Sequence, residues 1–176
     1  RVHQLTAGEA TEVAGLPIAA TPADHDSRRH PLGPPAEAVG YLLGPAGRQV
    51  YFAGDTDVFP AMETLADDLE VALIPVWGWG STLGPGHLDP VGAAAALRLL
   101  RPRLAIPIHW GTLFPFALDR LRGKVGLLSD PPHEFAWAAA DLAPHVEVRV
   151  LQPGDATALP VPPHSSLPVS SHRRVT

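Results

Sequence analysis

Short apolar runs that end abruptly in a polar residue occupy the middle of the chain. Val71 to Val76 and Leu104 to Ile108 contain almost no polar side chains, which is typical of strands buried on both faces of a sheet. Gln49 to Ala53 is a third such run, and it is predicted to form a hairpin with Val39 to Leu43 across the Gly- and Pro-rich residues 44–47. The pattern predicts a sheet whose strands deliver polar residues to one edge.

Helices are predicted where a capping residue precedes a periodic apolar segment. Asp89 and Pro90 begin one that runs to about Leu100, because Asp caps free backbone amides and Pro suits the first helical turn. Further elements are expected as strands over residues 2–5, 11–21 and 146–151, and as helices over residues 58–66, 114–121 and 132–142. Strands come first and then alternate with helices, which predicts an α/β protein whose sheets are covered by helices.

Composition narrows both the class of protein and the kind of site. The chain has 176 residues, of which 45% are hydrophobic, enough for one domain with a core. Its formal net charge is −5, so no surface for nucleic acid is predicted, and no apolar run approaches the roughly 20 residues of a transmembrane segment. Cysteine is absent and histidine occurs nine times, so any metal ion must be held by His, Asp or Glu.

The two ends of the chain differ from its middle. Residues 160–176 are rich in Pro and Ser and lack an apolar period, so we expect a domain over residues 1–159 and a flexible tail over residues 160–176. The first residue is Arg rather than Met, which leads us to expect a preceding segment. No secretory signal is visible in the chain, and a cytoplasmic location is expected.

Two apolar runs are followed by side chains that can hold a metal ion. Asp55 comes after Gly54, where a sharp turn brings its carboxylate into the open, and its two oxygens can bind one ion or bridge two. His109 follows Ile108, and imidazole is the commonest metal ligand. Each has an ordinary alternative: an Asp at a strand end often accepts hydrogen bonds from turn amides, and a single His often bonds to a backbone carbonyl.

Loop residues add further candidates. His25 lies in a polar loop after a predicted strand, so it would approach the same edge as a ligand, or it is an exposed loop residue. Arg28 is a candidate for binding an anionic group of a substrate, or it pairs with a neighbouring Asp. His87 lies in a loop shaped by Gly and Pro and is a candidate substrate-binding or acid–base residue. Trp77 is a candidate pocket wall, or part of a packed loop.

Four segments in this order resemble metallo-β-lactamase-fold hydrolases over about residues 2–159. They are PADHDSR at 22–28, YFAGDT at 51–56, GHLDP at 86–90 and PIHWGT at 107–112. The similarity is greatest to the branch that includes ascorbate-6-phosphate lactonases and N-acyl-phosphatidylethanolamine phospholipase D. The resemblance implies the C-terminal portion of an αββα sandwich, with mixed sheets flanked by helices and a dinuclear centre, usually of zinc, at one sheet edge.

The resemblance also implies roles for the candidate residues. His25 would complete the first metal site, Asp55 would bridge the two metal ions and serve catalysis, and His109 would bind the second ion. His87 would line the substrate pocket as a catalytic or substrate-binding residue. The family's His-x-His-x-Asp-His motif, which supplies most ligands of both metals, is absent from this sequence. We therefore expect a partial domain, in which three candidate ligands do not make a tight two-metal centre.

The implied function is a hydrolase that uses a metal-activated water. Zinc is the expected metal, with manganese or iron as alternatives, and the bond attacked would be a lactone, phosphodiester, amide or similar bond of a small-molecule or lipid-like substrate. The lack of Cys and of a Gly-x-Ser-x-Gly segment agrees with a mechanism that needs no nucleophilic side chain. The alternative is a non-catalytic domain of the same fold that acts as a binding or structural module.

Overall fold

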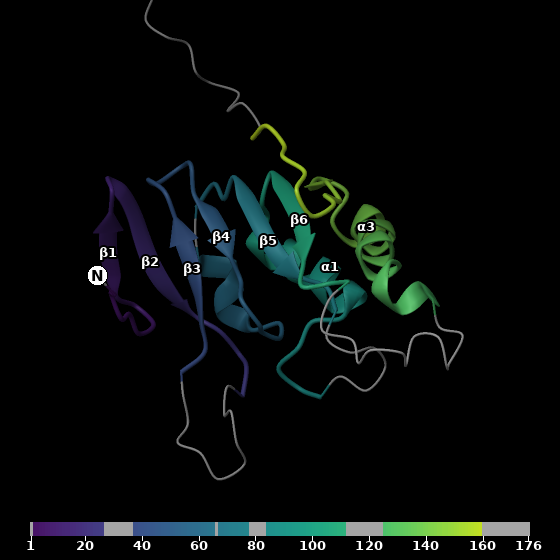
Figure 1. Cartoon of the computed structure of the whole chain (residues 1–176), viewed down its shortest axis with the longest axis horizontal. Coiled ribbons are helices and arrows are strands. Elements are labelled where there is room, and N and C mark those ends of the chain that lie inside the picture. Colours follow the sequence, from purple (N-terminus) through teal and green to yellow (C-terminus); the bar gives the residue numbers. More distant parts are fainter. Residues whose placement is uncertain (1, 27–36, 66, 78–83, 112–124, 160–176) are drawn as a thin grey trace, which may run out of the picture.

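A single mixed sheet organises the described part of the chain (Figure 1). The structure is a computed structural model that describes residues 2–26, 37–65, 67–77, 84–111 and 125–159. The strands are β1 (Ala10–Val13), β2 (Leu16–Pro22), β3 (Val39–Leu43), β4 (Val50–Phe52), β5 (Val71–Pro75), β6 (Leu104–Ile108) and β7 (Glu147–Val148). They lie in the order of the chain; β1 to β4 pair antiparallel and β4 to β7 pair parallel.

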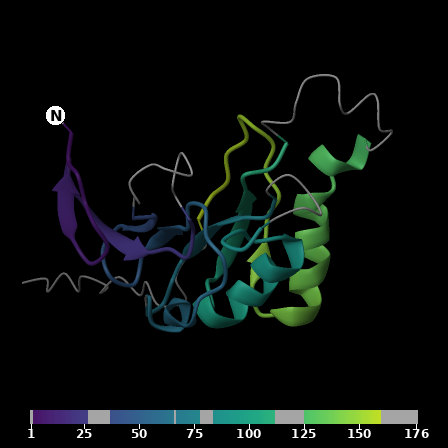
Figure 2. The same ribbon diagram turned by 90° about the horizontal axis from the view of Figure 1, so that it is seen from below.

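The helices gather on one face of this sheet. They are the 3-10 helix η1 (Pro60–Thr64) and the α-helices α1 (Pro90–Leu100) and α3 (Pro131–Leu142); a second 3-10 helix, η2 (Val125–Leu128), precedes α3. Because the parallel strands follow one another in order and crossovers are right-handed, the connecting helices must fall on the same face. Figure 2 shows α1 and α3 side by side on that face. The described residues thus form one sheet and one helix layer of the four-layer sandwich implied by the resemblance.

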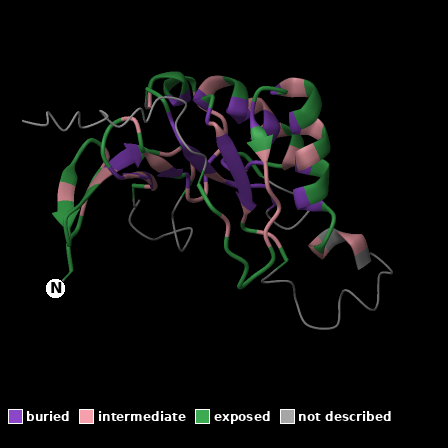
Figure 3. Ribbon diagram, turned by 90° about the horizontal axis from the view of Figure 1, so that it is seen from above, coloured by how far each residue is buried: buried purple, intermediate pink, exposed green. Residues whose placement is uncertain are grey.

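The main core lies between the sheet and the helices. Tyr51 of β4 and Phe135 of α3 are fully buried there, as is Leu97 of α1. Complete burial of a side chain such as Leu97 stabilises the fold by about 1.5–3 kcal/mol. Apart from Leu97 and Leu100, the buried residues of α1 are alanines, whose small size lets the helix approach the sheet and α3 closely. Figure 3 shows buried residues in the central strands and on the inner sides of the helices, whereas β1 is largely exposed.

A smaller apolar cluster lies on the opposite face of the sheet. Val71, Leu104 and Ile106 are its buried members, and Leu151 from the segment after β7 packs against them. The strand register places Phe52 on this same face, where 39% of its surface is exposed. This face therefore combines buried and exposed apolar side chains. No helix in the described ranges is long and apolar enough to cross a membrane.

The elements next to the candidate site agree closely with the sequence predictions. The strand over residues 104–108 and the helix over residues 90–100 are confirmed at the predicted bounds, and β3, β4, β5 and α3 within two residues. The Asp89 carboxylate accepts a hydrogen bond from the amide of Gly92 at 2.6 Å, which confirms the predicted helix cap. The helix ends at Arg101, whose φ of 47° breaks the helical path before Pro102.

Four predictions, near the ends of the chain and after β4, differ from the structure. Residues 2–5 form no strand, and the first hairpin turns at Ala14 and Gly15 rather than at residues 7–9. Both turn residues have positive φ, which suits a two-residue hairpin, but an alanine there gives no turn signal in the sequence. The helix expected over residues 58–66 is the five-residue η1, and the closing strand is the two-residue β7. The predicted helix over residues 114–121 and the predicted tail lie outside the described residues.

Candidate metal centre

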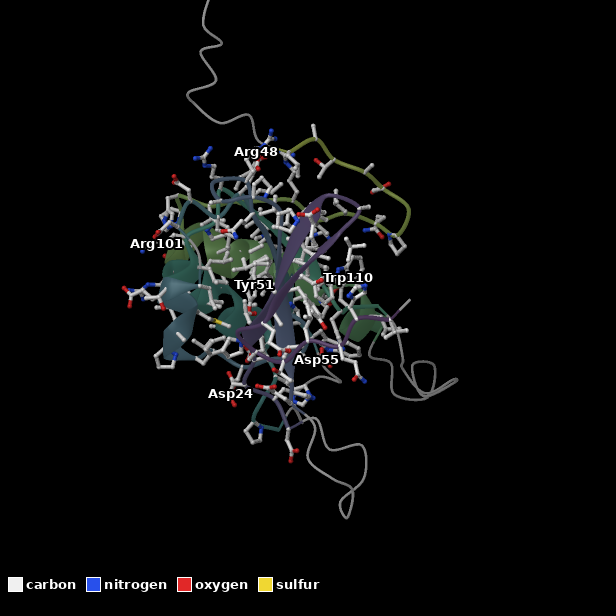
Figure 4. The ribbon with its side chains drawn as sticks, turned by 90° about the vertical axis from the view of Figure 1, so that its left-hand side faces the viewer. Asp24, Arg48, Tyr51, Asp55, Arg101 and Trp110 are labelled. Atoms are coloured by element: carbon white, nitrogen blue, oxygen red, sulfur yellow. The ribbon has the colours of Figure 1, made fainter. Side chains whose placement is uncertain are left out.

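The strand directions bring the candidate side chains to one edge of the sheet. Because β3 runs antiparallel to both β2 and β4, β2 runs in the same direction as β4, β5 and β6, so these four strands end at the same edge. The residues that follow them include His25, Asp55, Trp77 and His109. Figure 4 shows Asp24 and Asp55 at this end of the molecule and Arg48, which precedes β4, at the opposite end. The first turn of α1 begins here too, because α1 leads from the end of β5 back toward the start of β6.

His109 and Asp55 are in direct contact. Nε2 of His109 lies 3.2 Å from Oδ1 of Asp55, and each side chain is about one-third to two-fifths exposed. On its other side, Nδ1 of His109 lies 2.8 Å from the backbone carbonyl of Trp77. Since a carbonyl can only accept a hydrogen bond, Nδ1 carries a proton and Nε2 is the nitrogen directed at the carboxylate.

The contact shifts the pKa values of both partners. The hydrogen bond between His109 and Asp55, together with the negative charge of Asp55, raises the pKa of His109 to about 9, although burial of the ring opposes this shift. The same hydrogen bond, with the charges of His109, His25 and His87, lowers the pKa of Asp55 against the effect of burial. Without metal, the pair is therefore an imidazolium and a carboxylate at neutral pH.

The backbone at His109 is held in an unusual conformation. Its φ is 58°, in the left-handed region that L residues with a side chain seldom adopt, and Gly111 two residues later has a φ of 74°. Such a conformation persists only when its surroundings fix it, and here the Trp77 carbonyl and the Asp55 carboxylate both hold the ring. The abrupt turn after β6 thus directs the imidazole toward the carboxylate.

His25 and His87 lie next to this pair. Nδ1 of His25 is 2.9 Å from the carbonyl oxygen of Gly86, and the rings of His25 and His87 meet edge to face with their centroids 4.7 Å apart. Nδ1 of His87 is buried and has no hydrogen-bond partner among the described residues. A small, partly open pocket is lined by Asp55, Thr56, Pro75, Trp77, His87, Leu88 and His109.

The imidazole and carboxylate groups of this site suit a divalent metal ion, but they are too few to complete a metal site. His25 and His109 each direct Nδ1 at a backbone carbonyl, which leaves Nε2 as the nitrogen for a metal, an arrangement common to metal-binding histidines. No three His, Asp or Glu side chains within the described ranges come together closely enough to hold one ion. A catalytic zinc takes three protein ligands, so the donors described here are too few to complete such a site.

The sequence-based candidates are distributed as follows. Asp55 and His109 touch, His87 and Trp77 line the same pocket, and His25 contacts the ring of His87. Arg28 lies outside the described residues. Trp77 contributes its backbone carbonyl to His109, a contact that no side-chain pattern signals.

The sequence analysis did not identify two residues that shape the loops of the site. Asp57 and Gly86, which are 29 residues apart, are joined by a hydrogen bond between the amide of Gly86 and the Asp57 carboxylate. Asp57 had a local signal, because an Asp before an apolar segment suggests a helix cap, but that signal does not indicate a partner in a distant loop.

Comparisons with known proteins place the chain in a family. Residues 1–110 match the family described as "Beta-lactamase superfamily domain". A "UPF0173 metal-dependent hydrolase" from Thermococcus onnurineus is 36% identical over 150 residues, which cover 82% of this chain and 56% of the relative. One from Methanopyrus kandleri is 34% identical over 159 residues, covering 88% and 61%. The chain thus spans little more than half the length of these curated relatives.

Solved structures agree on the fold. Igni18, a metallo hydrolase from Ignicoccus hospitalis, superimposes with a TM-score of 0.62 at 29% identity over 86% of this chain and 57% of that one. The metallo-β-lactamase fold protein YhfI from Bacillus subtilis gives 0.58 at 9% identity over 84% and 52%, which bears on the fold alone. From the family match over residues 1–110 and these superpositions, the chain belongs to the beta-lactamase superfamily and has the metallo-β-lactamase fold.

Proposed function

We propose that this chain carries part of the metal centre and the substrate pocket of a metal-dependent hydrolase. The observation that carries the proposal is the contact between His109 and Asp55 in an open pocket, with His25 and His87 close enough to lower the pKa of the same carboxylate. The names of the relatives, which describe those proteins as metal-dependent hydrolases, support it.

In this proposal the metal is zinc, bound as two ions, with manganese or iron as alternatives. Asp55 would hold both ions, His25 would be a ligand of the first ion and His109 would be a ligand of the second. Zinc, when bound, would supply the activation of a water molecule and the polarisation of the bond that is hydrolysed. Asp55 and His109 suit these roles because their facing atoms, Oδ1 and Nε2, are the ones that a metal ion would engage.

The other pocket residues act on the substrate. Nδ1 of His87 is buried and has no partner in the described part of the chain, so it can form a hydrogen bond with a polar group that enters the pocket. Trp77 and Leu88 are almost fully buried and give the pocket an apolar wall. We therefore propose a small-molecule or lipid-like substrate with one polar bond to be hydrolysed, such as a lactone, phosphodiester or amide bond, as in the lactonase and phospholipase branch that the sequence resembles.

Zinc binding tests the ligand roles directly. Isothermal titration of the metal-free chain with Zn²⁺ should show binding that Asp55→Ala or His109→Ala weakens more than tenfold, because each variant removes a ligand. Asp141→Asn is a matched control, since this exposed carboxylate lies on α3 away from the pocket, and it should leave the affinity unchanged. Equal affinities for the wild-type chain and Asp55→Ala would contradict the bridging role.

One observation favours a second candidate function. No three candidate ligands converge within the described ranges, as expected of a non-catalytic domain that keeps the fold and serves as a binding or structural module. The two functions differ in their response to metal. Under the hydrolase proposal, His87→Ala lowers turnover of a chromogenic phosphodiester, carboxylic ester or lactone more than it lowers zinc affinity. A protein that binds no zinc and cleaves none of these probes would support the non-catalytic function.

A further inference from the structure

The side chain and the backbone of Asp57 together connect three loops at the edge of the candidate metal centre. Its Oδ1 accepts a hydrogen bond from the amide of Val58 at 2.7 Å, and its Oδ2 accepts one from the amide of Gly86 at 3.2 Å. The amide of Asp57 itself donates to the carbonyl of Asp24 at 2.8 Å. The loops that follow β2 and β4 and the loop that precedes α1 therefore meet at this residue.

A buried threonine strengthens the same junction. Thr56 is fully buried, and its hydroxyl oxygen accepts a hydrogen bond from the amide of Asp24 and donates one to the carbonyl of Asp57, both at 2.9 Å. Because these bonds are shielded from water, they restrict how far the loops can move relative to each other. The position of Asp57 is thus fixed from both of its backbone groups.

Gly86 links Asp57 to His25. Its amide is held by the Asp57 carboxylate, while its carbonyl accepts the hydrogen bond from Nδ1 of His25 at 2.9 Å. The φ of Gly86 is +88°, and a Cβ atom there would lie 3.2 Å from Cα of His25 and 3.4 Å from the carbonyl oxygen of Asp24. Only glycine combines this conformation with so close an approach.

We propose that Asp57 is a positioning residue that, through Gly86, holds His25 in the tautomer and orientation needed to bind a metal ion. A carbonyl oxygen can only accept, so its bond to His25 keeps the hydrogen on Nδ1 and leaves the lone pair on Nε2. Partners of this kind orient metal-binding histidines and fix their tautomer. The inference rests on the proposed role of His25 as a ligand and extends it to a residue that would not touch the metal.

A purely structural role would look different. If Asp57 only closed the turn at Val58, its loss would lower the stability of the fold and leave the ring of His25 as it is. If Asp57 positions Gly86, its loss must also change the hydrogen bonding of the His25 ring. The tautomer and hydrogen bonding of the His25 ring therefore distinguish a positioning role from a purely structural one.

The first arm of the test uses the metal-free chain labelled with ¹⁵N-histidine. Long-range ¹H–¹⁵N spectra, recorded where the ring is neutral, should show the proton of His25 on Nδ1 in the wild-type chain and a mixture of tautomers in Asp57→Ala. Asp57→Asn offers one acceptor oxygen instead of two, so it should shift the ring less and in the same direction. Asp89→Ala removes the cap of α1 without touching Gly86 or His25, so it should leave the ring signals unchanged.

Gly86→Ala adds an independent route to the same effect, because the new Cβ pushes against His25 while the Asp57 carboxylate stays in place. Combining it with Asp57→Asn should change the ring signals little beyond either single variant. Should Asp57→Ala fail to fold, Asp57→Asn and Gly86→Ala decide the question. Wild-type ring signals in a folded Asp57→Ala or Asp57→Asn chain would overturn the proposal.

The second arm measures Zn²⁺ affinity. Loss of a partner that orients a ligand typically weakens metal binding 10- to 100-fold, so Asp57→Ala should fall in this range and Asp89→Ala should match the wild type. Unchanged affinity in Asp57→Ala beside a wild-type chain that binds zinc would also overturn the proposal. A wild-type chain that binds no zinc would instead count against the proposed function, and the spectra of the metal-free chain would still decide whether Asp57 sets the tautomer of His25.

Discussion

At the scale of single residues, the contact between His109 and Asp55 makes a pH prediction for the metal-free chain. A raised pKa means that the folded state holds the proton of His109 more tightly, so the pair contributes to stability below the ordinary His pKa of 6.5 and loses this contribution as the pH rises through about 9. The lowered pKa of Asp55 means that the contribution also disappears in acid, below the ordinary carboxyl range.

NMR titration of the metal-free chain should therefore find His109 protonated up to about pH 9, and Asp55→Asn should lower its pKa toward 6.5. The unfolding free energies of the wild-type chain and Asp55→Asn should converge above this pH, because the ion pair is then lost in both. The difference at neutral pH should be small, since both side chains are a third or more exposed. A His109 pKa that Asp55→Asn does not change would contradict the assigned contact.

The residues of the site differ in how far the sequence reveals them. Asp55 and His109 follow apolar runs that are recognisable as buried strands, so their place at the sheet edge follows from local pattern and strand direction. Asp57 and Gly86 are in contact only because two loops pack against each other, and this contact produces no periodic sequence pattern in either loop. The Trp77 carbonyl is a backbone group that any residue would provide, so its hydrogen bond to His109 is not encoded by the side chain.

At the scale of elements, α1 shows why some parts of the fold were predictable. Its start is defined by Asp89 and Pro90 and its end by Arg101 and Pro102, so both ends can be recognised in the sequence. The turn between β1 and β2 has only Gly15 as a signal, because Ala14, the other turn residue, adopts a φ of 51° that its residue type does not favour. Local chemistry thus specifies α1, whereas the hairpin depends on strand pairing across the sheet.

The cap of α1 makes a stability prediction. Asp89→Ala removes the acceptor for the amide of Gly92 and should lower the unfolding free energy by about 1 kcal/mol, measured by urea denaturation. Asp89→Ser supplies another good capping oxygen and should recover most of this loss. If Ser destabilises the protein as much as Ala does, the carboxylate acts through something other than the cap.

At the scale of the whole molecule, the two faces of the sheet are covered unequally. One face packs against α1, α3 and η1, while the other is covered in part by the segment that contains Leu151. The strand register places Val13, Leu16 and Phe52 on this second face, and each is 39% to 46% exposed. Among the described residues, the outer edge of β1 pairs with no other strand, and exposed strand edges favour pairing with another chain.

We therefore expect the 176-residue chain on its own to self-associate through this face, with a second copy of the chain covering the exposed apolar side chains. Sedimentation velocity at micromolar concentrations should show species larger than the monomer. Phe52→Thr combined with Leu16→Thr should shift the distribution toward the monomer, because both changes keep strand propensity and remove apolar surface. Val91→Thr is the matched control, since Val91 is 59% exposed on α1, in the helix layer, and should leave the distribution unchanged. A wild-type chain that stays monomeric over this range would show that the segment around Leu151 already covers enough of the sheet.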